Sequence, residues 1–418
     1  MADLYQKTNT QVKTAVKLVT EEMKWFRSYP KEQIEVSANE NRVPLILNQP
    51  LFPANIAEGG NERIMATPVP QHGTFLPVQM NVRYGFSGLA QALTARARGA
   101  MIQDQIEYQA NMAGYSIGRG IGLSTYGQST GTVAVVKTTG SASATQNGIA
   151  IKNAYGSATF VPGGDGTVQD TYLSSLFRVG DHIALIRSAA IVEFASVVAS
   201  PSAASGVGFI DALFTSSITP TVGDLIVFAN ADGDNTITGT DVNNWAIGFT
   251  EILVASSLLG LATSSAANWA AGSTSTTVQR MSFIVKEKMI NDCWNAGGVQ
   301  INKFIVAQGV RRDAIMGQLG GRRYDGSDTD IEGDLNAGKG QSYFTSQLAL
   351  PGTLIGWYDK AVSKIELSDL PDDGASKSIF KLDKVQGKSQ VAASYDYFYQ
   401  RIPSSRAATG YATGLTST

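Results

Sequence analysis

The stretch from Ile301 to Gly326 reads "INKFIVAQGVRRDAIMGQLGGRRYDG", and it decides which fold we expect. Within it, "KFIVAQ" is typical of a short strand, and "VRRDAIMGQL" is typical of a short helix that starts with arginines. Upstream, "MSFIVKEKMINDCWNAGG" (281–298) predicts a helix, and downstream lies "PGTLIGWYDKAVSKIELSDL" (351–370). The chain from residue 278 onward therefore predicts an α+β unit.

The composition is poor in charge. Only 16% of the 418 residues are charged, 43% are hydrophobic, and 43 are glycine. Soluble domains usually carry about 25% charged residues. Because charges are depleted at the cores of interfaces, this composition favours a chain that buries much of its surface against neighbours. A secreted β-rich protein would share the same composition, so both interpretations stay open at this point.

The net charge and the first residues narrow the function classes. A net charge of −2 argues against a protein that condenses nucleic acid by neutralising phosphates. The single cysteine, Cys293, allows no internal disulfide, and "MADLYQKTNTQVKTAVKLV" (1–19) has no apolar run of signal-peptide length. No stretch is long and apolar enough to span a membrane. We therefore expect folding in a reducing cytoplasm, without export.

The first sixty residues predict a helix followed by an extended arm. Apolar residues recur at spacings of four and three and so lie on one helical stripe: Val12, Val16, Val19, Met23 and Phe26. The helix is expected to end before Tyr29-Pro30, and the prolines of "VPLILNQPLFPANIAEGG" (43–60) disfavour both helix and central strand. An arm this apolar is expected to lie on a neighbouring subunit.

A β-hairpin and a long helix are expected next. Residues 62–86 predict two extended runs around the turn "PQHG", and "SGLAQALTARARGAMIQDQIEYQANMAGYSIGRG" (87–120) predicts a long helix. Its apolar stripe shifts phase midway. The glycines that follow, Gly118, Gly120 and Gly122, are expected to mark the end of this helix. A nucleotide loop would follow a strand, so nucleotide binding is rejected.

The middle of the chain predicts a self-contained β module. Two segments rich in small residues, 137–148 and 263–277, flank a region of Gly-Asp turns and alternating strands. This region contains a short internal repeat, "VGDHIAL" (179–185) and "VGDLIVF" (222–228). In each copy a Gly-Asp turn leads into an apolar strand, as expected of a small barrel.

Residues suited to catalysis are scarce. The only histidines are His72 and His182; neither lies near Cys293 in sequence, and no motif pairs a nucleophile with a base. Cys293 lies on a predicted helix and is expected to be a packed small hydrophobe. We therefore predict no enzymatic activity and no cofactor.

One loop has the spacing of a weak calcium site. In "NADGDNTITGTD" (230–241) oxygen-bearing side chains fall at the ligand positions: Asn230, Asp232, Asp234, Thr236, Thr238 and Asp241. Asn235 replaces the usual glycine, and "GDLIVFAN" (223–230) predicts a strand where a calcium-binding hand would have a helix. An ordinary polar turn is favoured over specific calcium binding.

An acidic loop, "YDGSDTDIEGDLNAG" (324–338), follows two pairs of arginines. A solvated surface loop is the simplest interpretation, and complementary contacts with a second copy are the alternative. The residues concerned are Arg311, Arg312, Arg322, Arg323, Asp325, Asp328 and Asp330.

The order of these elements resembles the major capsid protein of tailed bacteriophages, whose Hong Kong-type shell fold is shared with encapsulins and the herpesvirus capsid floor. The stretch quoted first resembles the axial domain of that family, and "FRVGDHIALI" (177–186) resembles turn-strand units of its insertion domains. The resemblance covers nearly the whole chain and rests on element order, because the family has no invariant signature. It implies an α+β capsid fold with an inserted β-rich domain.

By this resemblance the chain divides into five parts: an N-terminal helix and arm (1–61), an extended β-hairpin loop (62–86), a peripheral domain with the spine helix (87–136), an inserted β-barrel-like domain (137–277), and an axial domain whose end returns to the peripheral domain (278–418). Contacts between copies are expected at Val12, Val16, Val19, Met23, Phe26, Arg63, Phe75, Arg83, Arg311, Arg312, Arg322, Arg323, Asp325, Asp328 and Asp330.

The implied function is a structural protein that self-assembles, through pentamers and hexamers, into the icosahedral head of a tailed phage. Double-stranded DNA would be a partner by containment only, and scaffolding, portal and decoration proteins are implied as further partners; no membrane is involved. The implied location is the virion, assembled in the host cytoplasm. An encapsulin-like shell that houses cargo and a calcium-dependent β-rich binding protein are the alternatives. Some members of the family fuse subunits through a lysine of the extended loop, but residues 62–86 contain none, so non-covalent contacts are expected.

Overall fold

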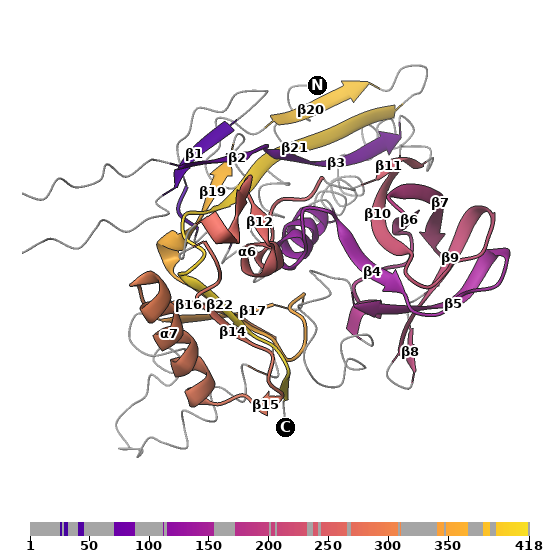
Figure 1. The fold of residues 1–418 in the computed structure, drawn as a ribbon. Helices are drawn as coiled ribbons and strands as arrows, with labels where there is room; N and C mark the ends of the chain where they lie inside the picture. The colour runs from indigo at the N-terminus through magenta and orange to yellow at the C-terminus, as the bar shows by residue number, and fades with distance from the viewer. Residues whose placement is uncertain are drawn as a thin grey trace, which may run out of the picture.

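The structure, a computed structural model, describes residues 26, 29–31, 41–45, 71–87, 112, 115–153, 172–199, 202–204, 207–231, 237–240, 244–265, 269–307, 310, 341–346, 348–366, 379–384 and 390–416. They form a sheet around one long strand, a β-barrel, and an α+β unit with one long helix (Figure 1). Within this part of the chain no helix is long and apolar enough to cross a membrane.

The first sheet is built around the long strand β21. Its members are β21 (Gln390–Pro403), β3 (Val78–Ser87) on one side, and β19 (Val362–Glu366) and β20 (Ile379–Lys384) on the other, all antiparallel to β21. Alternate side chains of a strand point the same way, so Tyr397, Tyr399 and Arg401 face one buried layer. The helix formed by residues 115–126 contacts this layer through hydrogen bonds to Tyr399 and Arg401.

The second unit is a closed six-stranded barrel, because β10 pairs with both β4 and β6. The ring runs in the order β10 (Leu225–Ala231), β4 (Thr132–Val136), β5 (Ser143–Asn153), β9 (Val207–Ile218), β7 (Ala190–Val197) and β6 (His182–Arg187). Two short strands attach to it, β8 (Ser202–Ala204) to β9 and β11 (Ile237–Thr240) to β10. Closure removes the free edges that an open sheet would expose.

The two copies of the internal repeat, 179–185 and 222–228, are neighbours in this barrel. β6 and β10 pair antiparallel, with Ile183 opposite Phe228. Each strand follows a turn whose glycine has a positive φ, 91° at Gly180 and 94° at Gly223, a conformation that glycine adopts without steric cost. Since the strands run in opposite directions, the two turns lie at opposite ends of the pair.

The third unit contains the strand "KFIVAQ" and the helix predicted over 281–298; the helix predicted over "VRRDAIMGQL" (310–319) lies outside the described residues except for Val310. Its sheet has the order β14 (Ser273–Ser275), β22 (Thr409–Ala412), β18 (Leu354–Trp357), β16 (Lys303–Val306) and β17 (Ser342–Thr345). The helix α7 (Phe283–Gly297) packs so closely on β22 that a Cβ at Gly410 would lie 3.0 Å from Met289 Cγ and 3.2 Å from Cys293 Sγ. α7 ends at Gly298 in the left-handed conformation.

The segment 263–277, rich in small residues and expected to flank the β module, packs into the body of the protein through its described residues. Trp269 is fully buried, and its Nε1 donates to the Leu261 carbonyl oxygen at 3.1 Å. A Cβ at Gly272 would lie 2.0 Å from the Ala407 carbonyl oxygen. The small residues here permit close packing. The strands of the barrel and the two attached to it lie between Thr132 and Thr240. The boundaries 137–277 of an inserted domain stay a prediction.

Short elements join these units. They are α6 (Phe249–Val254), β12 (Ser257–Leu258), β13 (Leu261–Ala262), η2 (Thr263–Ser265), β15 (Gln279–Arg280), η3 (Asp359–Ala361) and β23 (Leu415–Thr416). β12 pairs with β13, and β15 pairs with β23.

The expected hairpin over 62–86 is wrong. β2 (Gln71–Phe75) pairs with β1 (Asn41–Leu45), whereas β3 pairs with β21. Most of the proposed turn "PQHG" therefore lies inside a strand. Pro44, one of the prolines expected to disfavour a central strand, lies in β1. A proline is tolerated there because β1 pairs on one side only within the described part of the chain. We call β1 and β2 the ribbon; residues 46–70 connect its two strands.

The glycines near residue 120 also lie elsewhere than expected. Residues 115–126 are helical, so Gly118, Gly120 and Gly122 are inside the helix and do not end it. A Cβ at Gly120 would lie 3.0 Å from Met80 Cε on β3, so this glycine permits the close approach of helix and sheet. The helix ends at Gly127, whose N–H donates to the Leu123 carbonyl oxygen at 2.9 Å.

Candidate assembly surfaces

Phe26 is the one residue of the N-terminal stripe within the described part of the chain, and it is 0% exposed. Its ring lies edge-on to Tyr399 at 5.5 Å, and the Arg401 guanidinium lies 5.5 Å from its centroid. Phe75, on β2, is also buried in the same core. The expectation that these two side chains contact a neighbouring copy is wrong, because the subunit's own core covers them.

The residues after Phe26 are anchored to the sheet by a buried carboxylate. Lys31 forms a parallel bridge with Lys364 on β19. Glu366 is nearly inaccessible and lies 3.1 Å from Lys364 Nζ and 3.3 Å from Lys31 Nζ. The Tyr397 hydroxyl donates to the same carboxylate at 2.5 Å. These partners offset the desolvation of Glu366 and fix this part of the N-terminal segment on β19.

Arg401 is fully buried and binds the end of a helix. Its guanidinium donates to the carbonyl oxygens of Ile121 (3.1 Å), Ser124 (3.2 Å) and Ile247 (3.1 Å). Ser124 is one of the last four residues of helix 115–126, whose carbonyl oxygens lack intrahelical partners, and Ile121 lies one turn earlier. The helix dipole is negative at this end, which favours the cation. One side chain of β21 therefore joins the sheet, the helix and the segment that leads into α6.

Arg406 repeats this arrangement at α6. Its Nε donates to the Ile252 carbonyl oxygen, and its Nη2 donates to the Ala255 carbonyl oxygen at 2.8 Å. Burial lowers the pKa of Arg406 to about 10, while the Glu251 carboxylate raises it in part. The group therefore stays charged at neutral pH. Neither arginine is identified as a buried group from the sequence alone. The sign available in the sequence was that both lie among mainly apolar and small residues, in "YQRIPSSRAATGYA" (399–412).

Arg119 ties the barrel to helix 115–126. Nη1 and Nη2 donate to the two carboxylate oxygens of Asp181 at 2.9 and 2.6 Å, and Nη2 also donates to the Leu176 carbonyl oxygen. The guanidinium lies 5.2 Å from the ring centroid of Phe228, which stacks on Trp245. Asp181 comes from the first Gly-Asp turn, so the turn serves as an attachment point as well as a strand start.

A carboxylate and a backbone hydrogen bond hold the two ends of the barrel segment together. Glu251, on α6, accepts hydrogen bonds from Ser129 N (2.8 Å) and Ser129 Oγ (3.0 Å), just before β4. The Trp245 N–H, after the barrel, donates to the Ser129 carbonyl oxygen at 3.4 Å. The chain therefore enters and leaves the barrel side by side, as an inserted domain requires.

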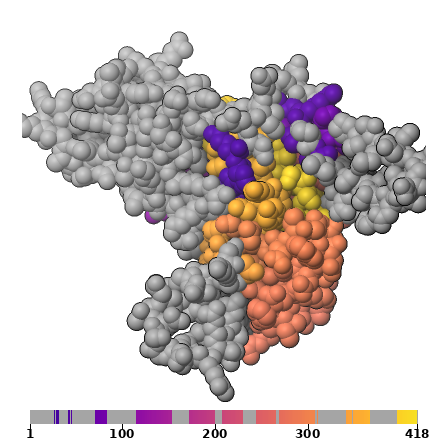
Figure 2. Space-filling model, turned by 90° about the vertical axis from the view of Figure 1, so that its left-hand side faces the viewer, coloured from indigo at the N-terminus to yellow at the C-terminus, as the bar shows by residue number. Residues whose placement is uncertain are grey.

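The outer face of α7 exposes large apolar side chains. Ile284 is 76% exposed, Trp294 52% and Phe283 49%, while the inner face buries Met289 and Cys293. Figure 2 presents this side of the molecule, with α7 in the orange region. Apolar side chains of this size on one helix favour contact with another surface.

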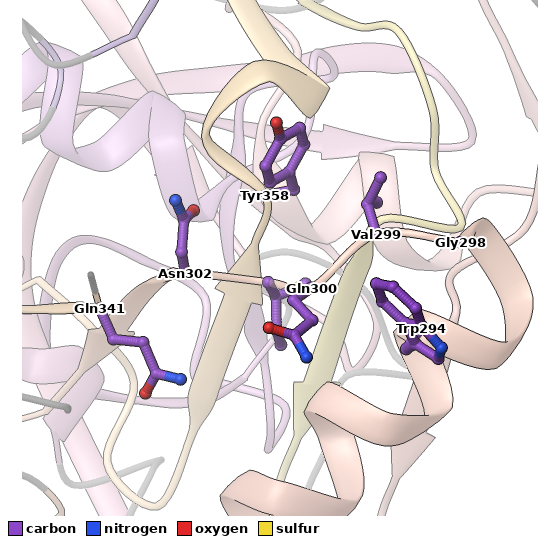
Figure 3. Close-up of a pocket in the computed structure, with 8 residues that line it drawn as sticks. Trp294, Gly298, Val299, Gln300, Asn302, Gln341 and Tyr358 are labelled. Carbon is purple, nitrogen blue, oxygen red and sulfur yellow. The ribbon is translucent and has the colours of Figure 1, made fainter. Parts of the chain in front are cut away.

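A hollow of about 360 Å³ lies at the C-terminal end of α7. Trp294 lines it from the helix, Gln300 and Asn302 from the segment before β16, Gln341 from the start of β17, and Tyr358 from the end of β18 (Figure 3). These lining side chains are neutral, and none is a nucleophile with a base beside it. The hollow can accept a complementary shape but offers no groups for catalysis.

The cysteine and the histidines are not arranged for chemistry. Burial, with a contribution from Asp292, raises the pKa of the Cys293 thiol to about 12, and Sγ lies 3.5 Å from the Thr409 carbonyl oxygen. Cys293 is thus the packed side chain that the sequence predicts. His72 lies exposed on β2, and His182 Nδ1 lies 2.9 Å from Ser196 Oγ. Among the described residues no three potential metal ligands gather.

The calcium-loop candidate lies between the paired strands β10 and β11, with Ala229 opposite Thr240. The predicted strand before the loop is β10, and Thr238 lies in β11. Calcium binding stays a prediction, because four of its ligands lie outside the described residues: Asp232, Asp234, Thr236 and Asp241.

Most of the expected contact residues also lie outside the described part of the chain. They are Val12, Val16, Val19, Met23, Arg63, Arg311, Arg312, Arg322, Arg323, Asp325, Asp328 and Asp330. Arg83 lies in β3, opposite Ser394 of β21.

No protein-family model and no curated protein matches the chain. Among solved structures, the capsid asymmetric unit of cyanophage A-1(L) matches with 8% identity over 95% of this chain and 93% of that chain, with a TM-score of 0.53. The capsid of a native GTA particle matches with 11% identity over 96% and 92%, and Gordonia phage Cozz with 12% over 94% and 86%; their TM-scores are 0.45 and 0.42. At this identity the cyanophage likeness shows a shared fold over nearly the whole length of both chains.

Proposed function

From this shared fold, the Hong Kong-type fold of phage capsid proteins, we propose that the chain is the structural coat protein of an icosahedral phage head. The observation that carries the proposal is the cyanophage likeness, because it includes the barrel, the long-strand sheet and the α+β unit in one alignment covering 95% of the chain. Fold alone does not fix function, so the surfaces must also suit assembly.

The composition and the exposed side chains support a role in assembly. A shell subunit needs large contacts with its neighbours, and obligate interfaces of roughly 2,000–5,000 Å² hold without covalent bonds. The apolar outer face of α7, with Ile284 and Trp294, is suited to such a contact. So is the ribbon, because extended segments reach across neighbours and exchange backbone hydrogen bonds.

Further contacts between copies are proposed for the charged and apolar residues outside the described part. The stripe Val12, Val16, Val19 and Met23 would form one side of a helix, and the arginines at 311–312 and 322–323 would pair with the acidic loop 325–334 of an adjacent copy. Such pairing would offset the repulsion between like charges around a symmetry axis.

The proposed partners follow from the same role. Copies would gather as pentamers and hexamers, and double-stranded DNA would be enclosed without being neutralised, in keeping with a net charge of −2. Scaffolding, portal and decoration proteins are the further proposed partners. The protein would assemble in the host cytoplasm and reside in the virion.

Sedimentation of the purified chain tests the proposal. We expect particles far larger than any small oligomer, together with a slower population of subunits or capsomers. A chain that stays monomeric or dimeric while folded, under conditions that vary salt, pH and crowding agent, would contradict it. A small shell that carries protein cargo and no DNA would instead identify an encapsulin-like function.

A further inference from the structure

A strained two-residue turn lies against the ribbon. β12 and β13 are joined by Leu259 and Gly260, whose φ angles are 53° and 79°. Glycine adopts such a conformation readily, but a leucine with positive φ is an outlier among L-residues. Strain of this kind persists where the surroundings over-determine it, so the contacts of Leu259 are informative.

The contacts of this turn are with β2. The Thr74 N–H donates to the Leu259 carbonyl oxygen at 3.0 Å, outside the ladder that joins β2 to β1. The Leu259 side chain is buried over Gly73, where an added Cβ would lie 3.0 Å from Leu259 Cβ and 2.9 Å from Leu45 Cδ1. A Cβ at Gly260 would lie 3.3 Å from Thr74 Oγ1. The fit leaves room for glycine alone at position 73.

The other side of the turn is held by the body of the protein. α6 ends directly before β12, and Arg406 binds the carbonyl oxygens of Ile252 and Ala255 at that end. A second contact holds the chain after β2, because Gln400 Nε2 donates to the Leu76 carbonyl oxygen at 2.9 Å. The ribbon is therefore attached to β21 through Leu76 and to the end of α6 through the turn, and its side chains Val43, Leu45 and Phe75 are buried in the main core. Residues 46–70 continue from Leu45 and Gln71.

We propose that the turn Leu259–Gly260 is a clamp that fixes the angle of the ribbon against the subunit. Leu259 acts as a positioning residue: its side chain fills the space over Gly73, and its carbonyl oxygen holds Thr74. The strained backbone brings both groups to β2 at once. The consequence for assembly rests on the proposed function: the clamp would set the direction in which the ribbon meets a neighbouring copy, and hence the uniformity of the shell.

Hydrogen exchange of the soluble subunit tests the clamp without any shell. In a peptide that contains Thr74, we expect Leu259→Asn to speed exchange about tenfold, because asparagine tolerates the turn but cannot pack over Gly73. The single variant Leu259→Met, which keeps a large apolar side chain, should leave exchange in the Thr74 peptide slow. Exchange at the wild-type rate in Leu259→Asn would overturn the proposal.

A matched pair of glycine variants separates clamping from general destabilisation. Gly260→Ala and Gly298→Ala both place alanine at a positive φ, but an added Cβ meets Thr74 Oγ1 at position 260 and nothing within 4 Å at position 298. We expect only Gly260→Ala to speed exchange in the Thr74 peptide. Equal effects of the two variants would show that no clamp operates.

Particle size supplies the second readout. If the wild-type chain forms shells, those of Leu259→Asn should vary more in diameter than those of Leu259→Met, as seen by electron microscopy. Identical size distributions for the two would overturn the role in assembly. If the wild type forms no shell, the proposed function fails, and the exchange experiment still decides whether the clamp exists.

Discussion

Arg119 and Asp181 form a two-point ion pair that joins helix 115–126 to the first Gly-Asp turn of the barrel, at 2.9 and 2.6 Å. Both side chains are 17% exposed, so water screens the pair only in part. The second Gly-Asp turn uses its carboxylate differently, because Asp224 pairs with Arg187, a partly exposed residue of the barrel's own strand β6. The first Gly-Asp turn thus attaches the barrel to helix 115–126, and the second stabilises the barrel itself.

Removing this attachment should weaken the protein measurably. We expect Arg119→Met to lower the free energy of unfolding by about 2 kcal/mol, since charge-assisted hydrogen bonds to a partly buried carboxylate are lost. Arg178→Met, at an exposed arginine of the same turn, should change it by less than about 0.5 kcal/mol. Urea unfolding measures both. A double-mutant cycle with Asp181→Asn that gave no coupling would refute the attachment.

Arg401 should be far more sensitive, because three carbonyl oxygens and a helix end depend on it. We expect Arg401→Met to cost about 4 kcal/mol or to prevent folding, since it leaves buried acceptors unpaired. Arg401→Lys should also be destabilising, because an ammonium cannot span the same acceptors. A loss below about 1 kcal/mol for Arg401→Met in denaturant unfolding would contradict the capping role.

Close backbone packing at the start of α6 predicts a sharp contrast between two glycines. A Cβ at Gly248 would lie 2.1 Å from the Gly127 carbonyl oxygen, whereas a Cβ at Gly223 would meet nothing within 4 Å. Gly248→Ala should therefore yield little soluble protein. Gly223→Ala, which suffers only from its positive φ, should cost about 1 kcal/mol. Comparable yields and melting temperatures would count against the packing described.

The second Gly-Asp turn should make stability depend on pH in acid. Burial raises the pKa of Asp224, but hydrogen bonds from Arg187 and Thr221 outweigh it and hold the pKa below its ordinary 3.8. A lowered pKa contributes stability that is present above the unfolded value and is lost as pH falls through the folded value. Stability should thus fall below about pH 4, and Asp224→Asn should flatten that part of the curve. An unchanged slope in urea titrations at several pH values would be the opposing result.

Covalent cross-links between copies are not expected. The sequence predicts the extended loop at 62–86, and the ribbon with its connection occupies 41–75. Neither range contains a lysine that could attack an amide. Arginine stays protonated and cannot replace it. Particles boiled in detergent should therefore run as a single band at 44.3 kDa. A ladder of multimers that survives reductant would be evidence for a cross-link elsewhere.

The sequence predicted what depends on local pattern. The α+β capsid fold with a β-rich insertion is confirmed, and the helix at 281–298, the strand at 303–308 and the strands after both Gly-Asp turns are found as α7, β16, β6 and β10. These segments carry their own apolar periodicity and turn glycines.

What the sequence could not predict depends on distant partners. β2 pairs with β1 rather than β3, and no local signal distinguishes the two choices. Gly120 looks like the end of a helix in the sequence, because the strand that packs against it, β3 with Met80, is recognised only in the structure. Arg119, Arg401 and Arg406 acquire their roles from carbonyl and carboxylate groups far away in sequence.

The proposed closed shell can be tested by a three-dimensional reconstruction of the assembled chain by electron cryomicroscopy. We expect an icosahedral wall, one chain thick, into which the subunit fits with the outer face of α7 and the ribbon both in contact with neighbouring copies. A folded subunit that forms only small discrete oligomers, or a wall in which both of these surfaces face solvent, would contradict it.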